Sequence, residues 1–427
     1  MKVLRHPEQT GELLRDRLEP WRAYEELLEY VRAIVEDVRR RGDEAVIEYT
    51  RRFDGVDLTE AGLRVSEEEL EEAYGSVPDG FPEAVEEVRG RVLKVSEEIL
   101  KRLRVEVSLG DASIKVEPRP LDSAGCYIPG GRASYPSTAI MAATPAAAAG
   151  VGRIIACTPP GPDGRVNPAT LVALDLCGVR EVYRVGGAQA VAAMAYGTET
   201  IRPVRVVVGP GNRYVTAAKM LVSQAVRVDV PAGPSELLVL ADSTADPRLV
   251  AMDMVSQAEH DPDAVCGLVT DSEELALKVV GEVEELLRVC PRGEVASESL
   301  SRNGFAVICS SIEAALEFVN MFAPEHLELH VGDPEELMDG VRSAGLVLVG
   351  PQTPTTLSDY WAGLSHVLPT GGFAHSHSGL SVLDFVRLVG FVECTAEGLR
   401  DSMRVVELLS RVEGLPNHLE AVAWRLR

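Results

Sequence analysis

The sequence predicts an α/β fold: two Rossmann-like parallel-sheet domains, with small helical segments at both ends of the chain. Three observations predict it. Short β-branched runs alternate with helical stretches from about residue 125 to about residue 350, which is typical of βαβ units in a parallel sheet covered on both faces. Helical periodicity dominates residues 21–105 and returns after about residue 384. The chain has 427 residues, 46% of them hydrophobic, which is enough for more than one domain.

Composition excludes several classes of protein. A formal net charge of −24 opposes nucleic-acid binding, because that affinity comes largely from Lys and Arg on phosphates. No run of about 18 apolar residues occurs, so we expect no membrane span. The first residues lack the apolar stretch of a secretory signal. Seven cysteines, none in a C-x-x-C pair, argue against a disulfide framework and a Cys-rich zinc site. We therefore expect a soluble, cytoplasmic protein.

The helical elements flank the α/β part of the chain. Residues 1–22 are expected to form an N-terminal helical arm, and residues 21–105 carry apolar side chains at helical spacing. Within that stretch, SEEELEEAY offers a capping box between Ser66 and Glu69. After about residue 384 the pattern is helical again, which predicts a small C-terminal tail.

The apolar runs between these flanks predict the strands: RIIACT, EVYRVGG, VRVVVGPG, ELLVLAD, AVCGLVTD, FAVICSS and AGLVLVGP. Ligands bind at the carboxyl ends of the strands in sheets of this kind. Three Gly-rich loops fall there: YIPGGR (127–132), VGGAQA (185–190) and VGPGNRY (208–214). No G-x-G-x-x-G lies between a strand and a helix. The sequence therefore suggests a nucleotide-binding fold without its usual dinucleotide fingerprint.

The stretch MVSQAEHDPDA looks like the end of a helix running into a turn. Gln257 and His260 stand three residues apart, so on a helix they share one face and could present two ligands to one ion. Zinc takes three or four ligands from His, Asp, Glu or Cys, and Gln is an uncommon one. A plain polar helix face is the alternative interpretation of this pair.

The stretch FAPEHLELHV places Glu325 and His326 at the apparent start of a strand. Neighbouring strand residues point to opposite faces, but at the mouth of a strand both can border one cleft. The two could divide acid–base work, because His titrates near neutrality and Glu can activate water. A surface pair is the alternative.

Two further segments carry polar side chains among Gly and Pro residues. TLSDYWAGLSHVLPTGG has the composition of an ordered binding loop and contains Asp359 and His366. VEGLPNHLEAV places Glu413 and His418 around a turn that opens the last helix. For the first segment, the alternative interpretation is an elaborate turn. For the second, it is that His418 is a capping or surface residue.

Eight motifs of the chain, taken together and in their order, are more specific than any one of them. CYIPGGRASYPST, VGGAQAVAAMAYGT, VGPGNRYVTAAK, AGPSELLVLAD, SQAEHDPDA, FAPEHLEL, DYWAGLSHVLPTGG and LPNHLEAV follow one another along the chain. Together they resemble the histidinol dehydrogenase family over nearly the whole length. The resemblance implies an enzyme of histidine biosynthesis that depends on zinc and NAD. It would oxidise L-histidinol to L-histidinaldehyde and then to L-histidine, using two NAD.

The resemblance also implies roles for individual residues. The zinc ligands, one ion per subunit, would be Gln257, His260, Asp359 and His418. The acid–base pair would be Glu325 and His326, and the NAD contacts Tyr127, Gln189 and Asn212. The residues at the substrate would be Ser235, His326, His366 and Glu413, together with the zinc ligands. The family is a homodimer, so Glu413 and His418 would complete the partner subunit's site from a tail that crosses over.

With these roles, the expected division of the chain has four parts. They are an arm (1–22), an α/β domain with the metal and acid–base residues (23–126 and 236–380), an NAD-binding α/β domain (127–235) and a helical tail for the partner's site (381–427).

The chain also departs from the family's pattern. Ser358 stands where the family usually has Gly, Ser365 replaces a common Asn, and His375 and His377 replace an Arg and small polar residues. These departures put the fine fit of the substrate in doubt. The reaction needs no thiol, so Cys126, beside the expected cofactor loop, is interpreted as structural.

Three other functions are alternatives to histidinol oxidation. A zinc- and NAD-dependent relative of the same fold could act on another small polyol, such as a sulfopropanediol, but it would not need the groups that hold an imidazole and an amine. A catalytically silent metal-binding protein would lack the pair Glu325 and His326. A nucleic-acid binder is opposed by the charge.

Overall fold

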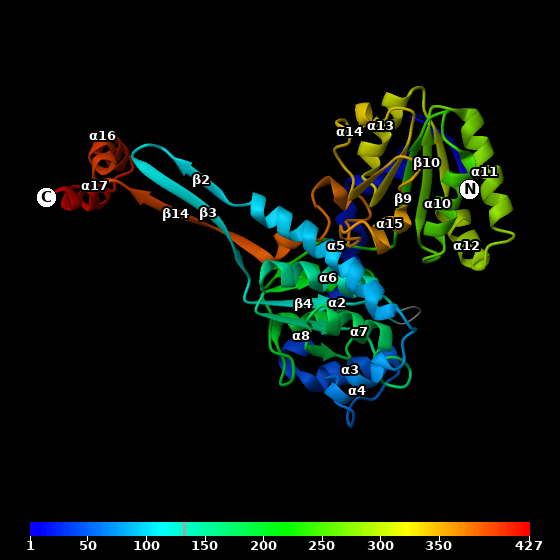
Figure 1. Ribbon diagram of the computed structural model, residues 1–427, viewed down its shortest axis with the longest axis horizontal. Helices are drawn as coiled ribbons and strands as arrows, with labels where there is room; N and C mark the ends of the chain where they lie inside the picture. Colours follow the sequence, from blue (N-terminus) through cyan, green and yellow to red (C-terminus); the bar gives the residue numbers. More distant parts are fainter. Residues whose placement is uncertain (131–133) are drawn as a thin grey trace.

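The computed structural model describes residues 1–130 and 134–427. Two parallel sheets form the centres of two α/β units, and a long arm with two helices at its tip extends away from both (Figure 1). The predicted α/β class with two parallel sheets is confirmed. Part of the Gly-rich loop 127–132, namely residues 131 and 132, lies outside the described residues.

Sheet A has six parallel strands in the order β1-β11-β10-β9-β12-β13. Its strands are β1 (Lys2–Arg5), β9 (Glu236–Ala241), β10 (Val265–Thr270), β11 (Phe305–Ile308), β12 (His326–His330) and β13 (Leu346–Val349). One face packs against α10 (Pro247–Ala258), α11 (Glu273–Leu286) and α12 (Gly293–Asn303). The other packs against α1 (Gly11–Leu18), α13 (Ile312–Phe322) and α14 (Pro334–Met338). A short helix, α15 (Thr355–Tyr360), follows β13 and contacts α10.

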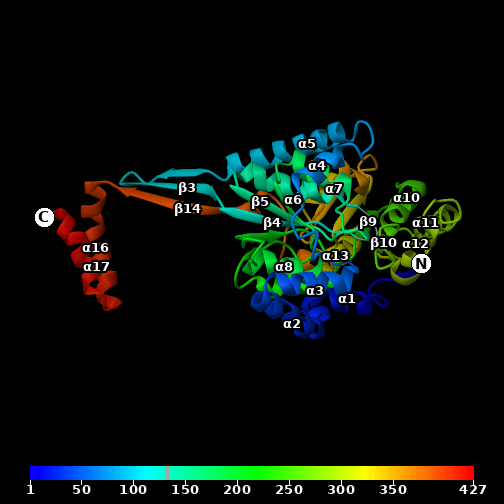
Figure 2. The same cartoon turned by 90° about the horizontal axis from the view of Figure 1, so that it is seen from below.

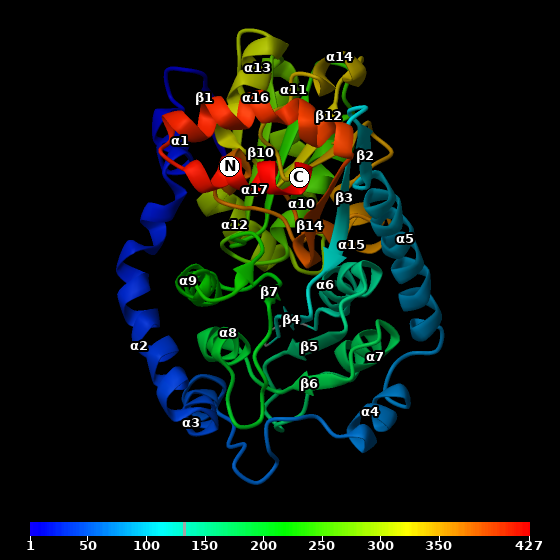
Figure 3. The ribbon, with the colours of Figure 1, turned by 90° about the vertical axis from the view of Figure 1, so that its left-hand side faces the viewer.

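Sheet B has five parallel strands in the order β6-β5-β4-β7-β8. Its strands are β4 (Ser123–Tyr127), β5 (Arg153–Cys157), β6 (Glu181–Tyr183), β7 (Val206–Val208) and β8 (Arg227–Val228). One face is covered by α2 (Glu25–Arg41), α3 (Asp43–Asp54), α8 (Gly187–Tyr196) and α9 (Arg213–Val222). The other is covered by α4 (Glu67–Tyr74), α5 (Phe81–Arg102), α6 (Pro136–Ala149) and α7 (Pro168–Leu176). Figure 3 shows these helices on both sides of the sheet.

This packing differs from the expected grouping of residues 23–126 with residues 236–380. Helices α2 to α5 share their cores with sheet B, and β4, which ends at Tyr127, is a strand of that sheet. Their amphipathic pattern predicted helices correctly, but such a pattern does not specify which sheet the apolar face will cover. The predicted capping box on α4 is confirmed, with Ser66 and Glu69 each accepting from the other's backbone N–H.

The third sheet is antiparallel and forms the arm. Strand β3 (Ala112–Pro120) pairs with β2 (Val105–Ser108) on one side and with β14 (Val386–Cys394) on the other. Beyond β14 come α16 (Ala396–Val412), α17 (Pro416–Ala423) and the 3-10 turn η4 (Trp424–Leu426), which stand apart from both parallel sheets (Figure 2).

Both ends of the chain contain a strand where we expected only helix. β14 lies in the segment 381–427, and β1 lies in the segment 1–22 and pairs with β11. Both strands are specified by partners that are distant in the sequence, so local periodicity does not reveal them. Three 3-10 turns complete the elements: η1 (Pro20–Tyr24), η2 (Phe373–His375) and η3 (Val382–Phe385). In the described part of the chain, no helix has the length and apolar character to cross a membrane.

Candidate active site

The predicted acid–base pair lies at the amino-terminal edge of sheet A. His326 opens β12 and Glu325 precedes it, and both side chains are buried. The neighbouring strand β9 opens at Glu236, whose N–H donates a 2.6 Å hydrogen bond to Oε2 of Glu325. Nδ1 of His326 lies 3.2 Å from the carbonyl oxygen of Glu236 and 3.5 Å from Oε2 of Glu325. The backbone of β9 therefore fixes both members of the pair.

The electrostatics of this pair suit a proton acceptor. Burial raises the pKa of Glu325, and the His326 imidazole opposes that shift only in part. Burial lowers the pKa of His326, but the charge and hydrogen bond of Glu325 outweigh it, so the pKa of His326 is raised. Each group is thus a stronger base than it would be in water.

Glu236 contacts the acid–base pair, and its place beside the pair was not predicted from the sequence. Its side chain, buried like its backbone, forms a 2.7 Å ion pair with the buried Arg17 and accepts a hydrogen bond from the N–H of Gly371. The α1 helix is in this way tied to the strand that holds the acid–base pair. The polar start of the buried run SELLVLAD was the signal available in the sequence.

Asp359 and His366 face each other beside the pair. Asp359 belongs to α15, and its Oδ1 lies 3.2 Å from Nδ1 of His366. Burial raises the pKa of Asp359, but His366, His326 and His260 together lower it. Nε2 of His366 lies 3.3 Å from the hydroxyl of Thr138 on α6, so this loop joins the two α/β units.

Gln257 and His260 come to the same edge of sheet A. Helix α10 follows β9 and returns toward that edge, ending at Ala258. Gln257 is buried and His260 is exposed in the turn that follows. The α10 and α15 helices touch, and the hydroxyls of Ser256 and Thr356 lie 3.5 Å apart. Three of the four expected zinc ligands therefore belong to elements at one edge of sheet A, and the charge of His260 acts on Asp359. They would offer a carboxylate, an imidazole and an amide oxygen.

Ser235 also lies at this edge. It is half-buried, directly precedes Glu236, and its carbonyl oxygen accepts a 3.0 Å hydrogen bond from the N–H of Val265. Its place between β9 and the turn that carries His260 is compatible with a substrate contact.

Glu413 and His418 do not come to this site within the chain. Glu413 ends α16 and His418 lies on α17, and both are exposed at the tip of the arm (Figure 1). The structure thus separates an expected substrate contact, Glu413, and an expected zinc ligand, His418, from the body of the chain.

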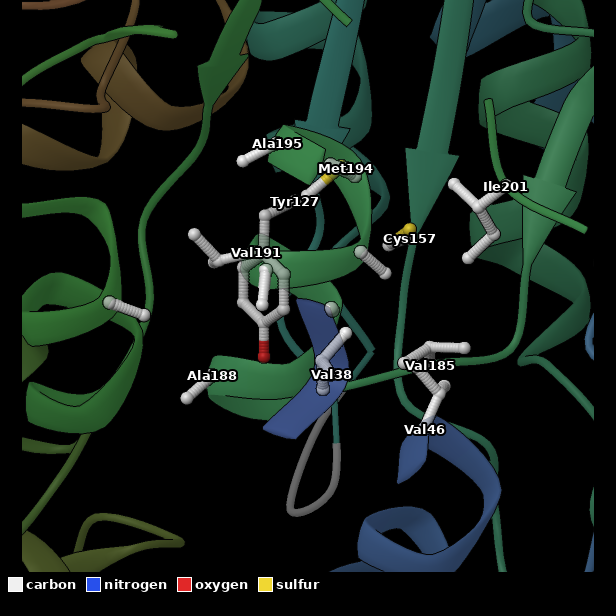
Figure 4. Close-up of a cluster of buried hydrophobic side chains, with 14 of the residues drawn as sticks. Val38, Val46, Tyr127, Cys157, Val185, Ala188, Val191, Met194, Ala195 and Ile201 are labelled. Carbon is white, nitrogen blue, oxygen red and sulfur yellow. The ribbon is translucent and has the colours of Figure 1, made fainter. Parts of the chain in front are cut away.

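The three expected NAD contacts gather at the carboxyl edge of sheet B. The Tyr127 hydroxyl accepts a 3.1 Å hydrogen bond from the N–H of Gly187, and its ring lies in the hydrophobic core (Figure 4). Burial raises the pKa of Tyr127 to about 12. Gln189 is 1% exposed, and neither polar atom of its amide has a hydrogen-bond partner among the described residues. Asn212 is exposed and caps α9 by accepting from the N–H groups of Tyr214 and Val215.

A cavity of about 660 Å³ opens at the same edge of sheet B, and its described lining includes none of these three residues. The loops that follow β4 and β5 line it, including Gly130 and Pro159. The other wall includes Phe53, whose ring is exposed, and Asp54 from the end of α3. One carboxylate oxygen of Asp54 is buried and has no hydrogen-bond partner in the described part of the chain, and burial raises the pKa of Asp54 to about 6. The sequence analysis missed both residues, because only the fold brings α3 to this edge.

The four residues that depart from the family's pattern lie in different environments. Ser358 is buried, with its hydroxyl 3.3 Å from Nε2 of His326. Ser365 accepts a hydrogen bond from the N–H of Val367, whereas His375 and His377 are exposed. Only Ser358 touches the acid–base pair. Cys126 is fully buried, and burial raises the pKa of its thiol strongly, which disfavours a nucleophilic thiolate there.

Comparisons with known proteins agree over the whole chain. The family model described as histidinol dehydrogenase matches residues 19–426. The histidinol dehydrogenase of Methanothermobacter thermautotrophicus is 47% identical over 408 residues, covering 94% of each chain. That of a Synechococcus strain is 47% identical and covers 92% of this chain and 91% of its own. The crystal structure of histidinol dehydrogenase from Elizabethkingia anophelis superposes with a TM-score of 0.91 at 36% identity, covering 100% of this chain and 98% of its own. This protein is therefore an oxidoreductase of histidine biosynthesis that belongs to the histidinol dehydrogenase family.

Proposed function

We propose that this enzyme oxidises L-histidinol to L-histidine through bound L-histidinaldehyde, using two NAD and one zinc ion per subunit. The observation that carries the proposal is the buried pair Glu325 and His326, held by β9 beside Asp359 and His366. A pair of bases buried beside potential metal ligands suits an alcohol oxidation that is followed by addition of water.

The residues present suit both groups that the family implies. For zinc, the ligands are Gln257, His260 and Asp359, with His418 from the partner subunit. For NAD, the loops at the carboxyl edge of sheet B form the site, with Tyr127, Gln189 and Asn212 as contacts. The unpartnered amide of Gln189 needs a polar ligand, and buried polar groups are rarely left unpaired. The unit on sheet B thus binds NAD and the unit on sheet A holds the metal.

The cavity beside Phe53 and Asp54 fits the adenosine end of NAD. An exposed aromatic ring offers a stacking surface for adenine, and a carboxylate with a free oxygen suits the ribose hydroxyls. The cavity volume of about 660 Å³ is in the usual range for ligand sites.

When bound, zinc would hold the substrate's imidazole and amine, and each NAD would accept one hydride. His326 accepts the proton of the substrate hydroxyl as the alcohol becomes an aldehyde. Glu325 then accepts a proton from water, which adds to the aldehyde carbon. His326 accepts a second hydroxyl proton as the hydrated aldehyde becomes the acid. Ser235, His366 and the partner's Glu413 orient the substrate.

We further propose a homodimer in which each tail enters the partner's site. The arm lies away from the body and carries exposed apolar side chains, among them Phe391, Leu408 and Leu409. Such a surface is typical of a face covered by another chain. The separation of His418 from His260 within one chain supports the same arrangement. A location in the cytoplasm remains a prediction.

A related dehydrogenase acting on a sulfopropanediol is the alternative, and it is not favoured. Such an enzyme would not need Glu413 and His418, which this chain has, and the full-length similarity is to histidinol dehydrogenases.

The test is the amount of NADH formed per L-histidinol consumed, measured on zinc-loaded protein and on a chelated sample. About two NADH, lost on chelation, would support the four-electron reaction and the metal together. Zinc-loaded protein that forms no NADH from histidinol would contradict the substrate assignment, and small diols would then be screened.

A further inference from the structure

A second group of potential metal ligands lies deeper in sheet A. Glu328 and His330 alternate along β12 and therefore point to the same face as His326, the face toward α10. Asp253 approaches from α10, one turn before Gln257. Nε2 of His330 lies 3.4 Å from Oε2 of Glu328 and 3.8 Å from Oδ2 of Asp253. The three ligand atoms all lie within 4.8 Å of one another.

The buried members of this group lack partners. His330 is 4% exposed, and neither of its ring nitrogens makes a hydrogen bond of good geometry with a described residue, although Nε2 lies 3.4 Å from Oε2 of Glu328. Glu328 is fully buried; Thr355 donates two hydrogen bonds to its Oε1, but no described residue donates one to Oε2. Buried polar atoms without partners cost about 1–3 kcal/mol each, more if charged, so native proteins rarely keep them. These atoms point at one another, which indicates a ligand common to all of them.

The negative charge of Asp253 and Glu328 also favours a bound cation. Asp253 and Glu328 are two carboxylates in a low-dielectric site, and no Lys or Arg of the described chain forms an ion pair with either. Burial and the charge of Glu328 raise the pKa of Asp253 to about 7. Two carboxylates and a neutral imidazole together balance the charge of a divalent ion.

We propose that Asp253, Glu328 and His330 form a second divalent-cation site, suited to Zn²⁺, separate from the ligands at the active site. Zinc bonds of about 2.0–2.2 Å to nitrogen and oxygen place neighbouring tetrahedral ligands about 3.4 Å apart. The distances from His330 to the two carboxylates match such edges. The side chain of Asp253 is 15% exposed and offers an entry path. An ion here ties α10, the helix that carries Gln257, to β12.

The experiment is a zinc count on the full chain. Protein is stripped with a chelator, reloaded with a small excess of Zn²⁺, separated from free metal and analysed by mass spectrometry. We expect about two ions per chain in the wild type, about one in His330→Gln and in His260→Ala, and none in the double variant. His377→Gln, which alters an exposed histidine outside both ligand sets, is the control and keeps about two.

A thermal readout accompanies the count. In the His260→Ala background, Zn²⁺ should raise the melting temperature, because the remaining site binds only the folded chain. Adding His330→Gln should abolish that rise. If His330→Gln does not fold, Asp253→Asn, at a partly exposed position, takes its place in both measurements.

Two results would overturn the proposal. One is a wild type with about one ion or none, whose count is unchanged by His330→Gln and Asp253→Asn. The other is a count of about two that both variants retain. In either case the two carboxylates would share a proton and hold no metal.

Discussion

The hydroxyl of Ser358 lies 3.3 Å from Nε2 of His326, on the side of the ring that faces away from Glu236. The same hydroxyl donates a 2.7 Å hydrogen bond to the carbonyl oxygen of Thr355, so its lone pairs are turned toward the ring. The Glu236 carbonyl can only accept a hydrogen bond. Both ring nitrogens therefore meet acceptors, which suits the protonated imidazole and agrees with its raised pKa.

Replacing Ser358 with Ala should lower the pKa of His326, because the protonated ring loses one acceptor. A base with a lower pKa is deprotonated at lower pH. The acid limb of the kcat/KM profile should therefore move to lower pH in Ser358→Ala. Ser365→Ala is the matched control, since the one hydrogen bond of the Ser365 hydroxyl to a described residue is with the N–H of Val367. An acid limb that stays in place in Ser358→Ala would contradict this role.

Glu325→Gln should slow the aldehyde step more than the alcohol step. The amide keeps the shape and can still lie beside the N–H of Glu236, but it cannot accept a proton from water. A general base of this kind contributes roughly 10²- to 10⁴-fold. We expect NADH per histidinol to fall from about two toward one, with histidinaldehyde accumulating. Equal losses in both steps would argue against Glu325 as the group that activates water.

His260→Ala should remove the active-site zinc and abolish histidinol oxidation while the fold persists, because His260 is exposed and contributes no core packing. Circular dichroism and the melting temperature check the fold, and NADH release checks activity. Full activity in this variant would show that the assigned ligand set is wrong.

Asp54→Asn should stabilise the protein at neutral pH. The folded pKa of Asp54 is raised from 3.8 to about 6, so the charged form is disfavoured in the folded state. The stability associated with its proton is complete below about pH 4 and is lost as pH rises through about 6. After allowance for solvent screening at this partly exposed group, the variant should gain about 1 kcal/mol at pH 7 and nothing at pH 4.

Urea unfolding of Asp54→Asn and wild type at the two pH values measures this difference. A second readout tests the cavity: KM for NAD should rise in Asp54→Asn while kcat changes little, because the residue would contact only the ribose. Asp57→Asn, near the end of the same helix but outside the cavity lining, controls for a general charge effect. An unchanged KM would remove Asp54 from the NAD site.

The proposed tail exchange predicts complementation between inactive variants. His418→Ala lacks the tail ligand and His326→Ala lacks the base. A mixed dimer has one site with both residues intact and one with neither. Random pairing after refolding a mixture together should recover about a quarter of wild-type activity. His326→Ala mixed with Glu325→Gln is the control and should recover none of the full reaction, since both residues belong to one subunit. Failure of the first mixture to recover activity would place His418 outside the partner's site.

Much of the fold could be predicted from the sequence, because local patterns encode it. Buried β-branched runs such as RIIACT and ELLVLAD became β5 and β9, and the capping box at Ser66 starts α4. The candidate site residues His260, Glu325, His326 and Asp359 could be predicted for the same reason, since each lies in a short contiguous motif. The order of these motifs along the chain also indicated the family.

The tertiary structure decided what depends on distant partners. It assigned α2 to α5 to sheet B, turned part of the expected helical tail into β14, and showed that Ser358 touches His326. It also placed Glu413 and His418 far from His260, and brought Asp253 to Glu328 and His330. The sequence by itself determined the elements and the family, because periodicity and motifs are local. Which side chains meet is set by packing between segments that are tens to hundreds of residues apart, and no local pattern records it.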